Sequence, residues 1–364
     1  IGIGFREFLI AEAVFSAVVI LGEVPSGYLS DIWKRKNVLA LGVTTQLAGY
    51  SILFIADGLA MVILSQGIIG AGLSLTSGTC QALLYDSLLE KGREDEFRRL
   101  EGKRHGLGLY ALAFACVVGG FLYQINPYAP LIADIIAITI ALIAVLLMKE
   151  PQRHKAEIRH SPFRDIWETA KYALHGHKEI AGIILFSAIL FAGSKIVMWS
   201  QQPYYMALEL PEAWFGILIA SGALLGGLGG QFGHRLEHIF RNKSLLITAM
   251  AVMVAAMVLA GAVIGYHGIA LLMLGSLIFG ICGPSVQDAI NSRIPSERRA
   301  TVLSTASLTV HLTFIPLSLG IGEISDSAGI GTALIMLGLI VGSLSSVFLL
   351  ALWRNGRKGK KKDA

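Results

Sequence analysis

Long apolar stretches recur along the whole chain, and they constrain its fold more than any other feature. Clusters of charged or turn-forming residues divide them into eleven stretches of about 20 residues or more, the length that crosses a bilayer as a helix. Their apolar residues are continuous, whereas the strands of a membrane β-barrel alternate. Only 15% of the residues are charged, against about 25% in soluble domains. The sequence therefore predicts an all-α polytopic membrane protein.

The eleven expected membrane-spanning helices follow directly from these stretches. They are Phe5–Ser30, Val38–Ala56, Leu59–Leu89, Gly106–Gln124, Tyr128–Met148, Ile180–Met206, Ala213–Gly233, Ser244–Tyr266, Ile269–Asn291, Ala300–Ser325 and Gly331–Trp353.

Basic residues are distributed very unevenly between the two sides that these spans define. Except for Arg6 and Lys195, all lie in the loops after spans one, three, five, seven and nine, or in the C-terminal tail. Because basic loops stay on the cytoplasmic side of a membrane, we expect a multi-pass protein of the cell (inner) membrane with a cytoplasmic C terminus. The net charge of +5 then reflects topology and contact with anionic lipid, and no nucleic-acid partner is expected.

The two halves of the chain share a weak internal repeat. Residues 78–88 (GTCQALLYDSL) and 280–290 (GICGPSVQDAI) place Gly, Cys and Asp at matching positions, 202 residues apart. One class of transporters is built from such parallel repeats. Because the counterpart of the sixth span would lie mostly before Ile1, we expect that the first helix of the first half precedes this sequence, which makes the whole bundle 6+6.

The expected organisation has four parts. They are an N-terminal transmembrane half (1–149), a charged cytoplasmic linker with an amphipathic helix (150–178), a C-terminal transmembrane half (179–353) and a basic tail (354–364).

A glycine, an acidic residue and a basic cluster follow one another at the end of the first span. Gly27 precedes Asp31 by four residues, and Lys34, Arg35 and Lys36 come next. This pattern resembles the loop between helices two and three of the major facilitator superfamily, in a bacterial branch. From the residues alone, Asp31 can approach the N-terminus of another helix or pair with Arg35. The resemblance implies that Gly27, Asp31, Arg35 and Lys36 lock the cytoplasmic side shut.

Three of the ionisable residues inside predicted spans are candidates for a functional charge, because charge within a membrane is costly and usually functional. Glu12 and Lys195 lie at similar depths, so an ion pair between them is one hypothesis for an extracellular gate. Lys195 can instead contact substrate, take part in proton coupling, or extend its amine to the interface. Glu23 either supports the loop motif structurally or serves as a proton-coupling carboxylate.

The resemblance also implies which spans line the central cavity. Their polar or aromatic residues are the substrate-lining candidates, although small polar residues also join membrane helices to one another. Gln66 stands where many proton-linked members have Arg. The candidates are Gln66, Ser77, Gln81, Trp199, Gln202, Ser276 and Gln287, with Lys195 counted above.

These features predict a secondary active transporter that moves a small solute by alternating access. We expect proton-coupled efflux; the alternatives are an uptake carrier and a non-transporting sensor or assembly partner on a transporter fold. The sequence has no Gly-x-x-x-x-Gly-Lys-Ser/Thr loop, and its ionisable residues are scattered over several depths. We therefore expect no enzyme activity, no cofactor and no metal.

Overall fold

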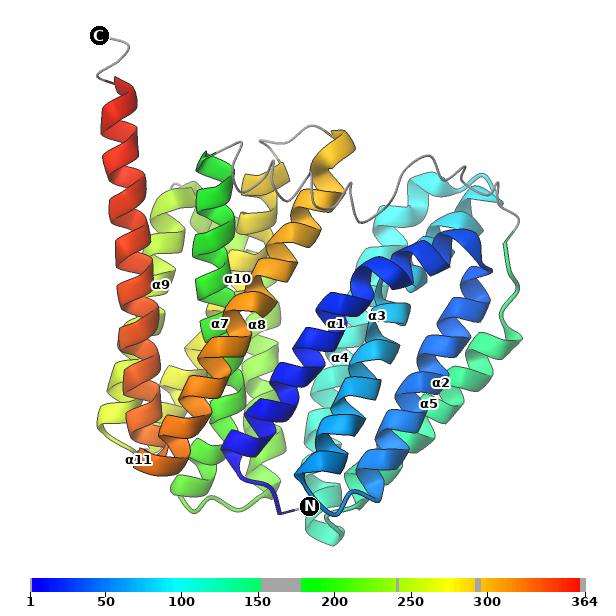
Figure 1. Ribbon diagram of the computed structural model, residues 1–364, viewed down its shortest axis with the longest axis horizontal. Helices are drawn as coiled ribbons and strands as arrows, with labels where there is room; N and C mark the ends of the chain where they lie inside the picture. The colour runs from blue at the N-terminus through cyan, green and yellow to red at the C-terminus, as the bar shows by residue number, and fades with distance from the viewer. Residues whose placement is uncertain (1, 152–177, 240–241, 292–295, 361–364) are drawn as a thin grey trace. The chain divides into compact units, whose positions relative to one another are not determined.

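The computed structural model describes residues 2–151, 178–239, 242–291 and 296–360 (Figure 1). These residues are almost entirely helical and include no strand. The helices form two compact units. The first contains α1 to α5 and the residues Glu212–Ile217 at the start of α8, and the second contains α7 and the remainder of α8 to α11.

Five α-helices and a short 3-10 helix make up the first unit. They are α1 (Phe5–Ile32), α2 (Arg35–Phe54), α3 (Leu59–Leu89), η1 (Glu94–Glu96), α4 (Phe97–Ile125) and α5 (Ala129–Leu147).

Helix α3 is the centre of the first unit, with α1 and α2 both packed along it and α5 packed on α2. Small residues permit this closeness. A Cβ atom at Gly70 would lie 2.9 Å from the backbone oxygen of Phe15 in α1, and one at Gly49 of α2 would lie 2.5 Å from the Ile69 side chain in α3. Glycines therefore bring the polar side chains of α1 and α3 within reach of one another.

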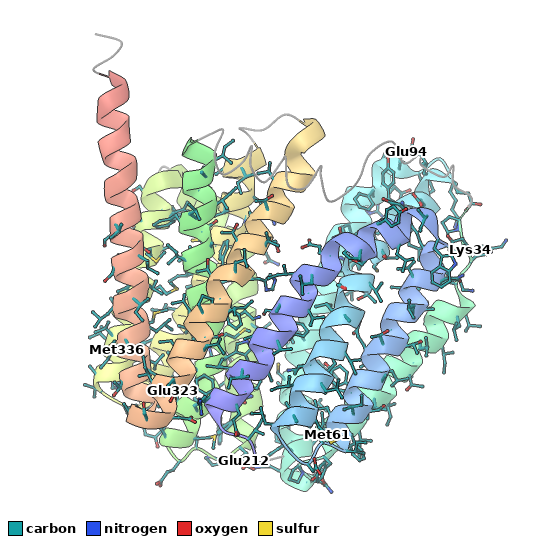
Figure 2. All side chains as sticks on the ribbon, in the orientation of Figure 1. Lys34, Met61, Glu94, Glu212, Glu323 and Met336 are labelled. Atoms are coloured by element: carbon teal, nitrogen blue, oxygen red, sulfur yellow. The ribbon has the colours of Figure 1, made fainter. Side chains whose placement is uncertain are left out.

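The helix connections at the two ends of the first unit differ in charge. Figure 2 places Lys34 and Glu94 at the same end of this helix bundle and Met61 at the opposite end. The α1–α2 and α3–α4 connections, which carry basic clusters, thus share one end, as the predicted topology requires. Helix α1 bends by 42° between Glu23 and Pro25 on its way to that end, because proline cannot donate the next helical hydrogen bond.

Five long helical segments make up the second unit. They are α7 (Lys178–Ala207), α8 (Ala213–Ile239), α9 (Asn242–Ala262), α10 (Tyr266–Asn291) and α11 (Ser296–Lys360).

Helix α11 comprises two of the predicted spans. Its apolar part, Thr305–Val347, has 43 residues, about twice the length that a bilayer needs. Gly329 interrupts it with φ 83° and ψ 162°, a backbone conformation that only glycine adopts readily. The chain reverses direction there (Figure 1), and Glu323 and Met336, on either side of the turn, lie at the same end of the second unit (Figure 2).

The two units repeat the same packing pattern. The sequence offset of 202 places α2 on α9, α3 on α10 and α5 on the second part of α11. Helix α2 packs on α3 and α5, and α9 correspondingly packs on α10 and α11. In the second unit, Gly261 of α9 and Gly331 of α11 meet backbone to backbone.

The predicted fold class is confirmed, with one adjustment to the spans. Helix α4 begins at Phe97 rather than Gly106, so its first two turns carry four of the basic residues of the preceding loop. The spans Ala300–Ser325 and Gly331–Trp353 correspond to the two parts of α11 on either side of Gly329. The amphipathic helix expected after Ser161 lies outside the described residues, and the domain boundaries around it stay a prediction.

Candidate functional site

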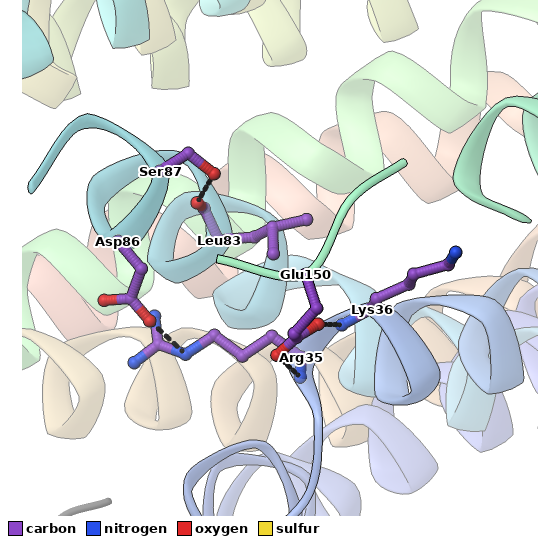
Figure 3. A network of polar contacts seen from close by, with 6 residues as sticks. All are labelled: Arg35, Lys36, Leu83, Asp86, Ser87 and Glu150. Carbon is purple, nitrogen blue, oxygen red and sulfur yellow. Dashed lines mark hydrogen bonds and ion pairs between the residues drawn. The ribbon is translucent and has the colours of Figure 1, made fainter. Parts of the chain in front are cut away.

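The N-terminus of α2 is the centre of a polar cluster in the first unit. We call Arg35, Lys36, Asp86 and Glu150 the motif cluster (Figure 3). Helix α2 starts on three basic residues and receives no side-chain cap from its N-cap residue, Lys34. Glu150, just beyond α5, provides the cap. Its two carboxylate oxygens accept the backbone N–H groups of Arg35 at 2.9 Å and Lys36 at 2.8 Å.

The side chains of the motif cluster link α2 to α3 and α5. The guanidinium Nε of Arg35 lies 3.1 Å from Oδ2 of Asp86, and these side chains are only 14% and 11% exposed. Lys36 Nζ donates to the backbone oxygen of Leu146 at 2.7 Å. Opposite charges in such a dry setting stabilise each other, and removal of either one leaves the other uncompensated.

A second polar pair lies inside the first unit, between α1 and α3. Glu12 is 6% exposed, and Nε2 of Gln66 donates to its Oε1 at 3.3 Å. Gly70, one turn after Gln66, allows the backbones of these helices to approach. Gln66 therefore supplies a neutral hydrogen-bond donor to a buried carboxylate.

The second unit contains a cation over an aromatic ring. Nζ of Lys195 in α7 lies 4.0 Å from the ring centroid of Phe314 in α11, and Phe314 is fully buried. A ring face attracts an ammonium group electrostatically. His311, one turn before Phe314, has a buried Nδ1 without a hydrogen-bond partner among the described residues.

Comparison with known proteins shows to which family this chain belongs. The sequence model of the Major Facilitator Superfamily matches residues 1–315. The chain belongs to that superfamily. It is similar to an uncharacterised MFS-type transporter, YxaM of Bacillus subtilis (strain 168), with 23% identity over 357 residues that cover 95% of this chain and 82% of the relative.

Solved structures of a nucleoside transporter share the fold. Two crystal structures of the nucleoside transporter NupG, one of them a mutant, superpose with TM-scores of 0.75 and 0.72. Each covers 96% of this chain and 90% of the matched chain at 14% identity. The chain is thus a multi-pass transporter of the Major Facilitator Superfamily, rather than a member of an enzyme family.

The residues of the superfamily loop motif have unequal roles in the structure. Arg35 and Lys36 are held in the motif cluster. Gly27 is exposed, and a Cβ there would meet nothing within 4 Å, so close packing does not require glycine at that position. Asp31 and Glu23 have exposed side chains. Pairing of Asp31 with Arg35 stays a prediction.

The predicted substrate-lining residues divide into exposed and enclosed positions. Ser77, Gln81, Gln202 and Gln287 are exposed, whereas Gln66, Trp199 and Ser276 are half-buried. Gln81 donates to Glu101 of α4 at 3.0 Å, and Glu101 also accepts from Arg104 at 2.7 Å. The side chain of Gln81 is therefore hydrogen-bonded to the Glu101–Arg104 ion pair near the start of α4.

Three residues that the structure places in buried or capping contacts were not predicted from the sequence. Asp86 was visible only as one position of the internal repeat. Glu150 could have been found as an acidic residue at the end of a span facing a basic helix start. Gln201, fully buried beside the exposed Gln202, had one available signal, the Tyr205 hydroxyl four residues later.

Proposed function

We propose that this superfamily member is a secondary active transporter that moves a small solute by alternating access, with the two repeated helical units rocking about a site near the middle of the membrane. The observation that carries the proposal is the buried carboxylate of Glu12 with its amide donor Gln66. A carboxylate inside an apolar bundle is expensive to keep unless it has a function.

The driving force that we propose is the proton gradient, with Glu12 as the proton-binding group. Glu12 of α1 is buried, and its hydrogen-bond partner Gln66 of α3 is neutral. Gln66 can donate to the carboxylate of Glu12, or accept from its carboxylic acid after rotation of the amide. The pair is therefore satisfied in both protonation states. The direction that we propose is efflux.

The motif cluster fits the role of a cytoplasmic lock. We place the end of the first unit that carries Lys34 and Glu94 on the cytoplasmic side of the inner membrane, because basic residues gather at that end. At that end, Arg35, Asp86 and Glu150 hold the start of α2 in a fixed position against α3 and α5. If the start of α2 is fixed in this way, the loop motif would move as a rigid body with the first unit when the two units rock.

Reconstitution in proteoliposomes tests the proposal with Glu12→Gln. Glutamine keeps the size and hydrogen-bonding capacity of the residue but does not ionise. A solute found by thermal-shift screening of nucleosides, amino acids, sugars and organic cations should be transported faster when a pH gradient is imposed. Glu12→Gln should abolish this acceleration while solute exchange at equal pH continues.

Glu7→Gln is the matched control, because Glu7 is on the same helix at the exposed start of α1, where it accepts from the Gly4 N–H. Its pH-driven transport should equal that of the wild type. Acceleration by the pH gradient that survives in Glu12→Gln would contradict proton coupling through Glu12. Inside-out and right-side-out vesicles separate efflux from uptake.

A further inference from the structure

One face of helix α4 carries a line of exposed residues that begins with two cations and continues with apolar and aromatic side chains. The line consists of Arg99, Lys103, Leu107, Tyr110 and Phe114, which follow one another at intervals of three or four residues. Residues at this spacing share one face of a helix. We call these five residues the α4 stripe. All five side chains are exposed.

The first turns of α4 pack on α3 through the opposite face. Phe97 and Glu101, two residues before and after Arg99, each lie about 160° around the helix from it. The ring of Phe97 meets Tyr85 of α3 edge to face, with centroids 5.4 Å apart. Glu101 accepts a hydrogen bond from Gln81 of α3 at 3.0 Å. These contacts turn the α4 stripe away from α3.

The two cations of the α4 stripe have no anionic partner in the part of the chain that the structure describes. Arg99 and Lys103 are four residues apart, and like charges at that spacing weaken a helix. Neither side chain forms an ion pair or a hydrogen bond with a described residue. Glu96, one turn before Arg99, accepts from Arg93 through both of its carboxylate oxygens. Arg99 and Lys103 can therefore bind an anion together.

The positions of these residues along the helix axis match the layers of a bilayer leaflet. Lys103 comes three residues and Arg99 seven residues before Gly106, where the apolar part of α4 begins, which is about 4.5 and 10.5 Å along the axis. The headgroup layer of one leaflet is about 5–8 Å thick, so both long side chains reach the phosphate level. Leu107 to Phe114 then extend about 10 Å into the apolar layer, where an acyl chain lies.

Helix α5 provides a comparison, because it has an apolar stripe without the cations. Its stripe is equally exposed and contains no basic residue; it consists of Ile132, Ile136, Ile140, Ile143 and Leu147. Such a surface suits the tails of any lipid. The α4 stripe differs by a pair of cations at its cytoplasmic end, which adds a preference for a negatively charged headgroup.

We propose that the α4 stripe binds one anionic phospholipid of the cytoplasmic leaflet. Its phosphate lies between the side chains of Arg99 and Lys103, and an acyl chain runs along Leu107, Tyr110 and Phe114. The phosphate relieves the repulsion between the two cations, and the negative charge of this leaflet favours its binding. The site goes beyond the proposed transport function and does not depend on which solute is moved.

Native mass spectrometry of the full chain tests the site with two lipids that have the same acyl chains. Dioleoylphosphatidylglycerol is anionic, and dioleoylphosphatidylcholine is zwitterionic. The wild type should bind the anionic lipid more tightly. Arg99→Gln combined with Lys103→Gln should weaken binding of the anionic lipid about thirtyfold, the combined effect of two basic residues near a membrane surface. Binding of the zwitterionic lipid and the thermal unfolding midpoint should not change, because both residues are exposed.

Matched variants separate the α4 stripe from the general charge and apolar surface of the first unit. Lys91→Gln with Lys149→Gln removes two other exposed cations and should leave binding of the anionic lipid unchanged. Phe114→Ala should weaken binding of the dioleoyl lipid about fivefold, the effect of a lost apolar contact. It should not affect dihexanoylphosphatidylglycerol, whose chains are short. Ile140→Ala on α5 should affect neither lipid.

Four outcomes would overturn the inference. Equal affinity of the wild type for the two dioleoyl lipids would show that the cations give no preference for an anionic headgroup. An unchanged affinity in the Arg99 and Lys103 double variant, or an equal loss in the Lys91 and Lys149 control, would show that the phosphate is not bound at the stripe. Complete displacement of the lipid by millimolar inorganic phosphate would mean that the cations bind a soluble anion. A dimer without bound lipid that Phe114→Ala dissociates would mean that a second copy covers the stripe.

Discussion

Glu150 closes the start of a helix that lies more than a hundred residues earlier in the chain, because its Oε2 accepts the backbone N–H of Lys36 at 2.8 Å. The first N–H groups of a helix have no partner within the helix and carry partial positive charge. Helix α2 begins with Lys34, Arg35 and Lys36, none of which can accept a hydrogen bond through its side chain. A carboxylate from beyond α5 therefore fixes two parts of the first unit together.

Removal of this cap should weaken the first unit. Glu150→Ala deletes both hydrogen bonds to the start of α2, and loss of a helix N-cap costs about 0.5–2 kcal/mol. We expect a lower midpoint of thermal unfolding in detergent, with Glu150→Gln intermediate because its amide oxygen still accepts one N–H. Glu90→Ala, an exposed acidic residue after α3, is the control and should unfold with the wild type. Equal midpoints for Glu150→Ala and the control would contradict the capping role.

The helices could be predicted from the sequence because each is an uninterrupted apolar stretch of bilayer length. The start of α4 could not, since Phe97 to Lys103 are polar enough to read as a loop and become helical only as an extension of the span. The break at Gly329 could be predicted, because the two apolar spans leave this glycine between them and its φ of 83° suits a turn.

The partners within the site were harder to predict than its helices. The loop motif indicated Arg35, but its ion-pair partner Asp86 is 51 positions away and was selected by the packing of α2 on α3. Gln201 and Gln202 are chemically identical and adjacent, and successive helical residues point about 100° apart. Only the tertiary structure decides that Gln201 is buried and Gln202 exposed.

The Arg35–Asp86 ion pair should show strong energetic coupling. Each single variant, Arg35→Ala or Asp86→Ala, leaves the other charge in a nearly dry environment without compensation. The double variant should therefore be less destabilised than the sum of the single ones, with an interaction energy of about 1–3 kcal/mol, measured from unfolding in mixed micelles.

The exposed pair Arg93–Glu96, whose Nε and Oε1 lie 2.6 Å apart, offers a matched cycle for comparison. Water screens such surface pairs, so its variants should combine additively. Additive effects in the Arg35–Asp86 cycle as well would show that this ion pair does not hold α2 against α3.

Two glycines on one face of α3 should respond oppositely to the same substitution. A Cβ at Gly70 would lie 2.9 Å from the backbone oxygen of Phe15, which cannot move without shifting α1. Gly70→Ala should therefore destabilise the protein by about 1–3 kcal/mol, the usual cost of overpacking. It should also separate Gln66 from Glu12 and so weaken pH-driven transport.

Gly67→Ala is the internal comparison on the same helix. Its Cβ would meet only Val14 and Val18 at 3.8 and 3.9 Å, so the methyl group adds contact, and alanine is favoured over glycine in a helix by about 1 kcal/mol. This variant should unfold at or above the wild-type midpoint. A lower midpoint in Gly67→Ala than in Gly70→Ala would refute the close approach of α1 and α3.

The gate hypothesis that pairs Glu12 with Lys195 makes a prediction that charge reversal can decide. Each residue has a contact within its own unit: Glu12 accepts a hydrogen bond from Gln66, and the amine of Lys195 lies over the ring of Phe314. If the two attract each other in one transport state, Lys195→Glu alone should slow solute flux at least tenfold, because two carboxylates then face each other. The combination of Glu12→Lys with Lys195→Glu should restore solute exchange, although proton coupling should stay lost. Flux in the double variant that is no better than in either single variant would exclude the gate pair and leave substrate contact or interfacial placement as the role of Lys195.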